Sequence, residues 1–530
     1  MENSYKEYWD KKKNTIEWFK KPKSIVKKFK NKCLFYDDGY TNVTYNCVQL
    51  NIIKGLGNKK AIIYFDKNKD TFSITYNQLD SLINYFINLF TKKFDLSFQK
   101  QVIAIHSSAN ICSSISMLAL AKLGITFCVI FDDLPKEAIK ARLKLLKCKI
   151  LITSTNNKNF NEKIKPIQRE IGIKVLRFSY DLKKNDVFNT VKFLKQKNFS
   201  VKYEYAKIKN NYPLFILFTT GSTGVPKGIV HSSGSYLIYT KLTCEKKFGM
   251  SQTSTILTAS DAGWINGHTY ALFGPLSVGA TTILIEKPTD LLISHTLKLI
   301  LMKFRVTILY MPVTLIRLIK AVNYNQFFNT KYLKVLGSMG EPLSNSVAKW
   351  FGSIFSKKKL PIINTYFQTE TGGIICSPAF NDKNVEKYYG SVGKPLTKHL
   401  GVFINEKNSE IKIKNPWPGC MINCLNGDKI WKKYFDYKKN FKLFDYGEIK
   451  SKQHFFVNGR IDDLINIRGH RVGSGEVESI LLKNSFIKEA CAIAIDDEIE
   501  GKKLIIFISV KKKYLYIILK ILLLKILENF

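Results

Sequence analysis

Extended apolar runs alternate with helical patterns along most of the chain, and this alternation is the feature that most limits its possible folds. AIIYF, which begins at Ala61, precedes a segment whose Leu79, Leu82, Ile83 and Phe86 share one helical face. The runs QVIAI, ITFCVIF, LFILF, TILTA, TTILIE, VTILYMP and VLGS follow in order. Strands separated by helices predict parallel sheets covered by helices, with ligands bound outside the carboxyl ends of the strands.

The chain has 530 residues, which is too many for one compact core and predicts subdomains or two domains. A Lys- and Asn-rich segment near 182–211 is typical of a solvated connection. Beyond about residue 390, short strands with turn signals indicate a change of subdomain. No internal repeat is visible.

A formal net charge of +41 is typical of proteins that bind nucleic acid or an anionic membrane surface. Only eight of the 83 basic residues are arginine, however, and the 75 lysines accompany abundant Asn, Ile, Phe and Tyr, which all have AT-rich codons. Mutational bias toward lysine therefore explains the charge better, and the sequence contains no arginine-rich face or recognisable nucleic-acid module. We expect no nucleic-acid partner; an RNA- or DNA-binding protein is the weaker alternative.

Three of the eight arginines lie close together, at Arg460, Arg468 and Arg471. A planar guanidinium that holds a phosphate or carboxylate at two points cannot be replaced by an ammonium group. In a lysine-biased chain this cluster predicts an anion-binding role, with chance clustering as the alternative.

The ten cysteines are scattered, and the close pair Cys420 and Cys424 has no second pair or histidine to complete a metal site. We therefore expect a reducing cytosol. The start, MENSYKEYWDKKKN, lacks an apolar core of signal-peptide length, so no export is predicted. The segment from Tyr514 to Phe530 is a little short for a membrane span and carries two lysines, so we expect no stable membrane insertion.

The strand LFILF runs directly into TTGSTGVPKG, a loop with unhindered backbone amides, hydroxyl groups and one ammonium group. Together these groups can form a cradle for an anion such as phosphate. The loop is not a Walker A motif, because Lys227 follows Pro226 and precedes Gly228. A surface loop of similar composition is the alternative, but the complete string ending in Pro-Lys-Gly is highly specific.

This string resembles the signature loop of the adenylate-forming enzymes, the superfamily of acyl-CoA synthetases, luciferases and amino-acid adenylation domains. Further motifs resemble that superfamily in the same order: GSMGEPL, NTYFQTETGG, KLFDYGE and GRIDDLINIRGHRVGSGEVES. EYWDKKKNTIEWFKK, TYNCVQL and SDAGWINGHTYALFGPLSVGATTILIEKP are similar to segments of its short-chain ligases, with the acetyl-CoA synthetase family first and propionyl-CoA synthetases next. The resemblance covers residues from about 5 to 508.

The resemblance implies an α/β fold whose large N-terminal domain has two parallel-sheet subdomains and a small β-barrel-like subdomain, followed by a small α+β C-terminal domain. We expect a short-chain ligase segment at 1–60, the AMP-binding domain at 61–461 and the start of the C-terminal domain at 462–510. The superfamily's late Pro-Lys-Thr-Arg-Ser-Gly-Lys-like string, whose last lysine serves adenylation, is missing. We interpret 511–530 as an aberrant apolar tail on a truncated domain, and a changed reading frame within Lys511–Lys513 as its hypothetical origin.

The implied function is an ATP-dependent acetate-CoA ligase of the AMP-forming type. The carboxylate attacks the α-phosphate of ATP to give acyl-AMP and pyrophosphate, and the CoA thiolate then displaces AMP. Both steps gather negative charge, so the protein supplies positioning and cations rather than a nucleophile. Implied partners are a small carboxylic acid, ATP, Mg²⁺ and CoA, in the cytoplasm. A propionate-CoA ligase and an inactive relic that keeps nucleotide binding are the alternatives.

The resemblance also assigns residues to roles. The catalytic residues are Lys227, Thr369, Glu370 and Arg471, and Glu370 is the expected ligand of Mg²⁺. The expected contacts to ATP are Thr219, Thr220, Gly221, Ser222, Thr223, Gly224, Gly340, Glu341, Pro342, Gln368, Asp445 and Arg460. Asp462 is the expected hinge about which the small domain swings between the two half-reactions.

The implied acid pocket consists of Trp264, Ile265, Asn266, Met339 and Phe367. Phe367 stands where acetate enzymes usually carry a second tryptophan, whereas Ile265 and Met339 are larger than the usual valines. One methylene is worth only about 1 to 3 kcal/mol in such a pocket, so acetate and propionate both stay open. For His268 we expect a structural or phosphate-orienting role, because an ionised carboxylate needs no general base.

Overall fold

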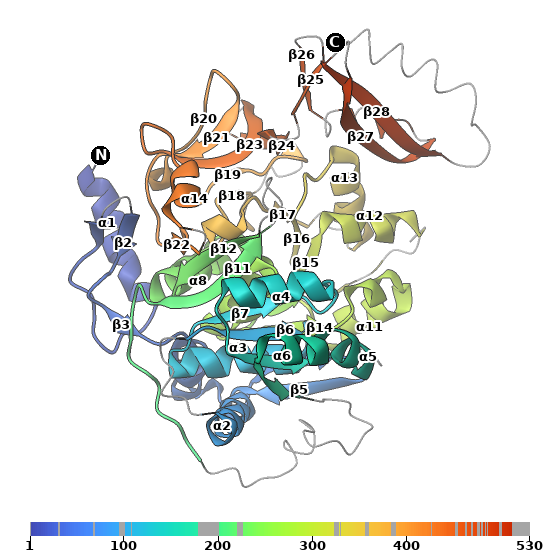
Figure 1. Ribbon diagram of the computed structural model, residues 1–530. Helices are drawn as coiled ribbons and strands as arrows, with labels where there is room; N and C mark the ends of the chain where they lie inside the picture. Colours follow the sequence, from blue (N-terminus) through green and yellow to red (C-terminus); the bar gives the residue numbers. More distant parts are fainter. Residues whose placement is uncertain are drawn as a thin grey trace.

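The computed structural model describes residues 2–29, 32–66, 69–94, 101–107, 109–178, 201–219, 226–322, 328, 330–355, 360–382, 388–425, 427–450, 454–461, 464–467, 470–473, 477–478, 481–482, 484, 486–497 and 501–510. Two seven-stranded sheets form the body, and antiparallel strands follow toward the C-terminus (Figure 1). Six predicted site residues, Thr220, Gly221, Ser222, Thr223, Gly224 and Asp462, lie outside the described residues, as do Arg468 and the segment 511–530.

The first sheet has the strand order β22-β12-β11-β7-β6-β8-β9. Its strands are β6 (Ile103–Ser107), β7 (Phe127–Ile130), β8 (Ile150–Ser154), β9 (Lys174–Arg177), β11 (Pro213–Thr219), β12 (Lys227–Ser232) and β22 (Asn423–Cys424). The five strands from β11 to β9 are parallel, and β12 pairs antiparallel with β11 and β22. The helices that accompany this sheet are α3 (Ile111–Leu123), α4 (Lys136–Leu145), α5 (Asn157–Asn159) and α6 (Lys165–Ile171).

The second sheet has the order β17-β16-β15-β13-β14-β4-β5, parallel except for the edge strand β5. Its strands are β4 (Lys60–Phe65), β5 (Thr71–Thr75), β13 (Thr255–Thr258), β14 (Thr281–Ile285), β15 (Ile308–Pro312), β16 (Val335–Met339) and β17 (Ile362–Asn364). The helices around it include α9 (Ile265–His268), α10 (Gly274–Ser277), α11 (Ser294–Lys303), α12 (Val313–Ala321) and α13 (Asn345–Ile354).

Helix α2 (Tyr76–Lys93) shows how the sequence specifies its elements. Thr75 and Gln78 form a capping box that satisfies backbone amides at the start of the helix. The four apolar residues predicted to share one face, Leu79, Leu82, Ile83 and Phe86, are all fully buried. The predicted alternation of strands and helices is confirmed here and along both sheets.

The two sheets share one apolar core. Phe127 and Phe215 of the first sheet belong to the same buried cluster as Ile62 and Leu284 of the second. Helix α8 (Gly234–Phe248) is buried along most of its length and contributes Leu237 to that cluster. The sheets therefore form one body rather than two separate units.

The N-terminal segment is tied to distant parts of the chain. It contains α1 (Glu2–Lys12), β1 (Val26–Phe29), β2 (Lys32–Phe35) and β3 (Tyr40–Thr41), and β3 pairs with β10 (Ile208–Lys209). Tyr36 donates a hydrogen bond to the carbonyl oxygen of the fully buried Trp9 at 2.6 Å. The Tyr5 hydroxyl donates to the Pro416 carbonyl oxygen at 2.7 Å.

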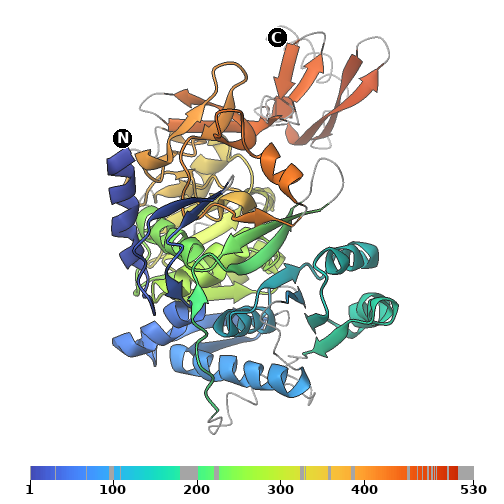
Figure 2. The same cartoon turned by 60° about the vertical axis from the view of Figure 1, so that its left-hand side comes forward.

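A four-stranded antiparallel sheet, β20-β21-β23-β24, corresponds to the predicted small β subdomain. Its strands are β20 (Val402–Ile404), β21 (Glu410–Ile413), β23 (Phe441–Lys450) and β24 (His454–Arg460), with β18 (Cys376–Ser377), β19 (Lys394–Pro395) and α14 (Asp428–Lys433) before β23. The hairpins β25 (Leu464–Ile467) with β26 (His470–Gly473) and β27 (Ile487–Asp497) with β28 (Gly501–Val510) follow. Figures 1 and 2 show them at the upper right, apart from the two large sheets.

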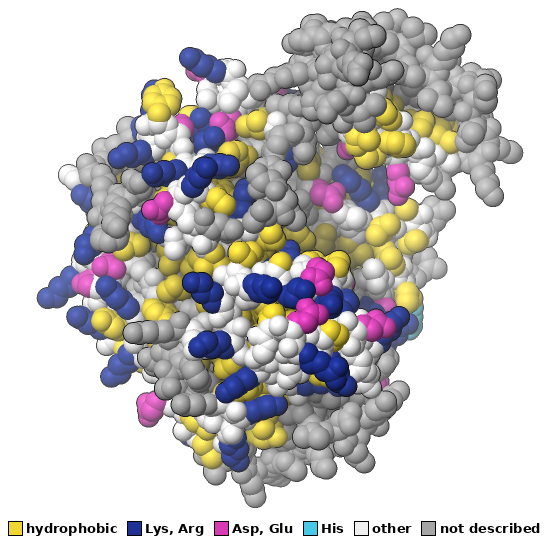
Figure 3. Space-filling view, viewed as in Figure 1, with side chains coloured by type: hydrophobic (Ala, Val, Ile, Leu, Met, Phe, Trp, Pro, Cys, Tyr) yellow, Lys and Arg dark blue, Asp and Glu magenta, His cyan; other side chains and the backbone are white. Residues whose placement is uncertain are grey.

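The lysine-rich surface does not form one continuous band on the face shown in Figure 3. Lys and Arg side chains are spread over this face, and several lie beside acidic side chains. Lys136 and Lys140, for example, both pair with Glu170, at 2.9 and 2.8 Å. In the described part of the chain, no helix is both long and apolar enough to cross a membrane.

Candidate active site

The predicted anion loop is held at its two ends by the hairpin β11–β12. Thr219 is the last residue of β11 and Lys227 is the first of β12, and the two face each other in the ladder. The Thr219 hydroxyl is buried and has no hydrogen-bond partner among the described residues. The hairpin therefore fixes where the loop leaves and re-enters the sheet, with an unused hydroxyl at its base.

Lys227 and Glu370 both contact one tyrosine, Tyr434. The Lys227 ammonium lies 5.6 Å from the centroid of the Tyr434 ring, and the Tyr434 hydroxyl donates to Glu370 Oε1 at 2.6 Å. Burial and the neighbouring Glu370 carboxylate raise the pKa of Tyr434, so its hydroxyl stays protonated and remains a donor. The structure thus brings together two predicted catalytic residues that are 143 positions apart in the sequence.

Asp445 is the centre of a second polar group. Its Oδ2 accepts hydrogen bonds from the Tyr366 hydroxyl and from Gln368 Nε2, both at 2.6 Å. Its Oδ1 lies 3.5 Å from the Arg460 guanidinium, which faces it directly across the β23–β24 ladder. Burial raises the pKa of Asp445 to about 6, although the tyrosine, arginine and glutamine all favour its ionised form.

The turn that carries the predicted ATP contacts Gly340, Glu341 and Pro342 follows the carboxyl end of β16. Gly340 has φ of 88°, a left-handed conformation that glycine adopts without a steric penalty. The Glu341 carboxylate does not face the other site residues; it pairs with Arg317 on α12 at 3.0 Å and accepts a hydrogen bond from Thr314. A second nitrogen of Arg317 donates to the Pro342 carbonyl oxygen at 3.4 Å. Helix α12 thus holds this turn through one of the rare arginines.

The predicted acid pocket is partly assembled. Met339 and Phe367 belong to one apolar cluster with Tyr270, and the Phe367 ring meets the Tyr270 ring edge-on at 5.5 Å. Ile265 is buried in the neighbouring cluster, against which Phe367 also packs. Trp264 instead keeps 55% of its surface exposed and contacts the Phe131 ring. Trp264 is therefore exposed, whereas Ile265 and Met339 are buried, and the pocket itself stays a prediction.

Three polar side chains near this pocket have unused atoms. Both amide atoms of the buried Asn266 lack a hydrogen-bond partner among the described residues, as do His268 Nε2 and His231 Nδ1. Burial lowers the pKa of His268 to about 3 and that of His231 to about 4, so both rings are neutral at pH 7. The His268 ring stacks on Phe127, and its Nδ1 lies 3.2 Å from the Trp264 carbonyl oxygen. These contacts favour a structural role for His268.

His231 supports the segment that carries Thr369. Its Nε2 lies 2.6 Å from the Thr369 carbonyl oxygen, which can only accept, so the proton is on that nitrogen. The following turn is closed by Gly372, whose φ is 69°. Arg471 lies on β26, but its side chain is outside the described residues, so its contact to the site stays a prediction.

Glu370 offers a carboxylate to a divalent cation, although the described residues contain no group of three or more His, Cys, Asp or Glu that could hold a metal by themselves. Only Oε1 of Glu370 is engaged by Tyr434. Mg²⁺ usually binds proteins through one or two carboxylates together with phosphate oxygens of the substrate. The residues present fit that arrangement. Cys420 and Cys424 are free thiols and form no disulfide.

Sequence reasoning missed Tyr366, Tyr434 and Arg317. Tyrosine is common in this chain, with 26 copies, so Tyr434 carried no signal. Tyr366 lies inside the NTYFQTETGG string, and its position there was the available signal. Arg317 was detectable by the same argument that singled out Arg460, because arginine is rare here.

Comparisons with protein families agree with this arrangement. A family model described as "AMP-binding enzyme" matches residues 53–422, and a model described as "Acetyl-coenzyme A synthetase N-terminus" matches residues 1–47. The chain is 31% identical to an acetyl-coenzyme A synthetase of Helicobacter pylori over 543 residues, covering 95% of this chain and 80% of the relative. It is 29% identical to one from Leptospira biflexa, covering 95% and 82%.

A solved structure shares the fold. The chain resembles the anthranilate CoA ligase AuaEII in complex with anthranoyl-AMP, with a TM-score of 0.76, 18% sequence identity, and coverage of 92% of this chain and 90% of that one. At this identity the likeness shows the fold alone. It confirms the predicted α/β architecture.

Proposed function

The chain belongs to the family of AMP-binding enzymes, and we propose that it catalyses the ATP-dependent joining of a short-chain carboxylic acid, acetate first, to coenzyme A. The relatives named acetyl-coenzyme A synthetase, which match 95% of the chain, support this proposal, as does the N-terminal model of that same enzyme. The reaction would proceed through acyl-AMP, with release of pyrophosphate and AMP.

The observation that carries the proposal is that two polar groups lie next to each other in the chain. One is centred on Asp445 and includes Gln368, and the other is centred on Tyr434 and includes Glu370. Asp445, facing Arg460, offers a carboxylate that can accept two ribose hydroxyls. Two residues beyond Gln368, Glu370 points to Tyr434 and through it to Lys227 at the base of the anion loop. A site with a hydroxyl acceptor at one end and a cation with a carboxylate at the other suits a nucleoside triphosphate.

We propose that Lys227, Thr369 and the loop 219–224 orient the phosphates, and that Glu370 holds Mg²⁺. When bound there, Mg²⁺ supplies positive charge against the pyrophosphate that leaves. No side chain has to act as a nucleophile, because the substrate carboxylate attacks the α-phosphorus itself. The role of this chain is to align the two reactants and exclude water. Arg471 would add a guanidinium to the phosphate or ribose oxygens.

The acid would lie between Met339, Phe367 and Ile265, with Trp264 as a cover. Phe367 is smaller than the tryptophan usual at this position, which favours some use of propionate. We also propose the division of the chain into 1–60, 61–461 and 462–510, with Asp462 as the hinge between the larger and the smaller domain.

The proposal is tested by incubating the purified chain with ATP, Mg²⁺, CoA and one acid at a time, and by measuring acyl-CoA, AMP and pyrophosphate by mass spectrometry. We expect acetyl-CoA to form faster than propionyl-CoA, and butyryl-CoA to form least. AMP must appear in a one-to-one ratio with acyl-CoA. Acyl-CoA formed together with ADP and phosphate would contradict the proposed route.

A further inference from the structure

A cavity of about 660 Å³ opens at the edge of the second sheet where its parallel strands begin. Lys60, Thr255 and Thr281 are the first residues of β4, β13 and β14, while Thr307 and Lys334 immediately precede β15 and β16. Met339, by contrast, ends β16 on the side of the proposed active site. A five-residue strand spans about 16 Å, so the two sites lie on opposite edges of the sheet.

The lining of this cavity is strongly basic. Five of its twelve residues are Lys or Arg, compared with 83 of the 530 residues in the whole chain, and none is acidic. They are Lys60, Lys303, Arg305, Lys331 and Lys334. None of the five forms an ion pair with a carboxylate of the described residues. The general excess of lysine does not account for a hollow with this lining.

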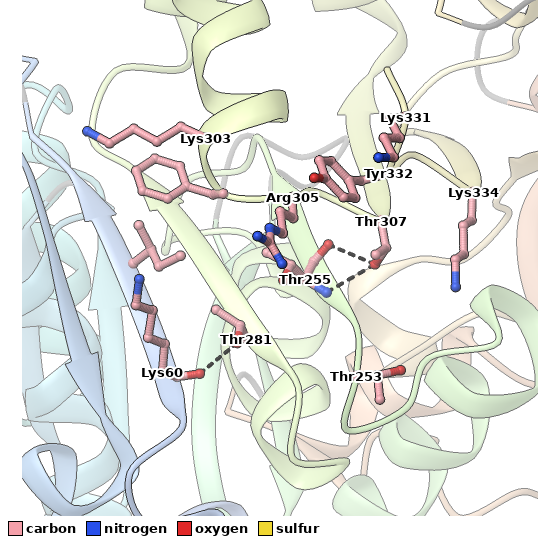
Figure 4. Close-up of a pocket in the computed structure, with 12 residues that line it drawn as sticks. Lys60, Thr253, Thr255, Thr281, Lys303, Arg305, Thr307, Lys331, Tyr332 and Lys334 are labelled. Atoms are coloured by element: carbon pink, nitrogen blue, oxygen red, sulfur yellow. Dashed lines mark hydrogen bonds between the residues drawn. The ribbon is translucent and has the colours of Figure 1, made fainter. Parts of the chain in front are cut away.

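The five side chains differ in direction. In Figure 4 the Arg305 guanidinium and the Lys60 ammonium both reach into the space in front of the strands, and Lys331 lies beside Tyr332. Lys303 points outward and donates to Thr71 Oγ1 at 3.3 Å, and Lys334 points away from Arg305. Arg305, Lys60 and Lys331 are therefore the cations best placed to contact a ligand in the cavity.

Arg305 stands out for two reasons. It is one of only eight arginines in the chain. It also has φ of 50°, a left-handed conformation that glycine adopts freely and that is unfavourable for a residue with a side chain. A guanidinium forms paired hydrogen bonds to phosphate oxygens, which an ammonium cannot reproduce. The position thus combines an unfavourable backbone with the side chain best suited to phosphate.

The cavity also has an aromatic wall. Phe304 and Tyr332 line it, and the Arg305 guanidinium lies 5.5 Å from the centroid of the Tyr332 ring. The Tyr332 ring is half-buried and offers a stacking surface for a flat ligand beside the Arg305 guanidinium. A volume of this size is typical of sites for small organic ligands.

We propose that this cavity is a second anion site, distinct from the active site, which binds a compound with two or more phosphate groups on an aromatic body, the chemistry of a nucleoside polyphosphate. The phosphates lie against Arg305, Lys60 and Lys331, and the flat group lies against Tyr332. This inference is independent of the proposed ligase function, because it uses none of the residues of that site.

The proposal is tested by hydrogen–deuterium exchange on the full chain, with no ligand, with inorganic tripolyphosphate and with ATP. Both probes should slow exchange in residues 303–307 and 331–334, and ATP should slow it more, because only ATP has an aromatic base. Slowing confined to 214–219, 226–232 and 366–371 would mean binding at the active site only and would overturn the proposal. Equal slowing by both probes at 303–307 would overturn its aromatic part.

A pair of variants gives a second test by titration calorimetry with tripolyphosphate. We expect Lys60→Glu with Arg305→Glu to weaken binding by about tenfold or more. The control, Lys398→Glu with Lys407→Glu, makes the same change in net charge at exposed residues elsewhere and should alter affinity by less than about twofold. Equal losses in both pairs would show that only the overall charge attracts the probe, which would contradict a built site.

Discussion

At the scale of single residues, the proposed ribose contact of Asp445 would link nucleotide binding to stability. Its carboxylate would have to be ionised to accept two ribose hydroxyls, yet burial raises its pKa to about 6 from 3.8. Between those two pH values the folded chain holds a proton that the unfolded chain has released. Stability therefore falls as the pH rises through this window, by up to about 3 kcal/mol for a shift of two units.

We predict opposite effects of Asp445→Asn on stability and binding. The variant should melt at a higher temperature than the wild type at pH 7, and at the same temperature near pH 4, where both carry a neutral side chain. Its affinity for AMP at pH 7 should fall by about 10- to 100-fold, because hydrogen bonds to a charged acceptor are lost. Wild-type affinity should itself weaken from pH 7 to pH 5.

Asp436 provides a control, because its contribution to stability should depend on pH in the opposite direction to that of Asp445. Its hydrogen bonds to Asn440 and Lys412 hold its pKa below the usual value despite some burial. Its contribution to stability is present at neutral pH and lost on acidification, so Asp436→Asn should lower the melting temperature at pH 7. Melting curves across pH 4 to 8 measure the stability of each variant, and AMP titrations over the same range measure its affinity for AMP. Equal destabilisation by both variants at pH 7 would refute the assignment.

Tyr434 is predicted to position Glu370. In Tyr434→Phe the ring beneath Lys227 stays, but the hydrogen bond to Glu370 is lost, and a bond to a charged group is worth about 1.5 to 3 kcal/mol. We expect kcat/KM for ATP to fall by about tenfold at limiting Mg²⁺, with partial recovery at high Mg²⁺. Tyr437→Phe is the matched control, because Tyr437 is 89% exposed. Initial rates across a Mg²⁺ series would contradict the role if the two variants behaved alike.

Phe367 is predicted to set the choice of acid. A larger ring in Phe367→Trp would fill the space next to Met339 and Tyr270. We expect kcat/KM for propionate to fall by about 10- to 200-fold, the value of one methylene in a hydrophobic pocket, with acetate changed far less. Met339→Val should instead raise kcat/KM for propionate relative to kcat/KM for acetate. Competition between labelled acetate and propionate measures it, and an unchanged ratio in both variants would place the acid elsewhere.

At the scale of elements, the turns after strands carry the site, and two glycines test how firmly they are held. Gly340 and Gly372 both have left-handed φ, at 88° and 69°. A Cβ at Gly340 would meet nothing within 4 Å, whereas at Gly372 it would lie 2.2 Å from the Gly419 carbonyl oxygen. Gly340→Ala should therefore cost only the backbone penalty of about 1 to 2 kcal/mol. Gly372→Ala should cost clearly more in urea unfolding, and the reverse order would contradict the packing.

The strands and the principal helices could be predicted from the sequence, because their signals are local. Buried parallel strands such as β7 and β15 are continuous apolar runs, and α2 has a complete capping box. The resemblance also assigns roles to residues within one motif, such as Gln368 and Glu370, and those roles stay predictions. Contacts between motifs could not be predicted, because they depend on which strands pair. Nothing in the sequence shows that Tyr434 contacts both Lys227 and Glu370.

At the scale of the whole molecule, composition misleads unless it is compared with structure. A charge of +41 is spread over the chain, and many lysines pair with acids or lie alone on the surface. Among the described residues, by contrast, one cavity has a basic lining with no acid in it. Sequence alone could not locate that cavity, because its residues come from several strands and loops between positions 60 and 334.

The central claim is that the chain activates an acid by adenylation, and isotope exchange from labelled pyrophosphate into ATP tests it most directly. The purified 530-residue chain is assayed at saturating Mg²⁺ without CoA, with acetate, propionate, butyrate or no acid. We expect exchange that depends on the acid and is fastest with acetate. Absence of acid-dependent exchange, in a chain that still binds ATP, would contradict it.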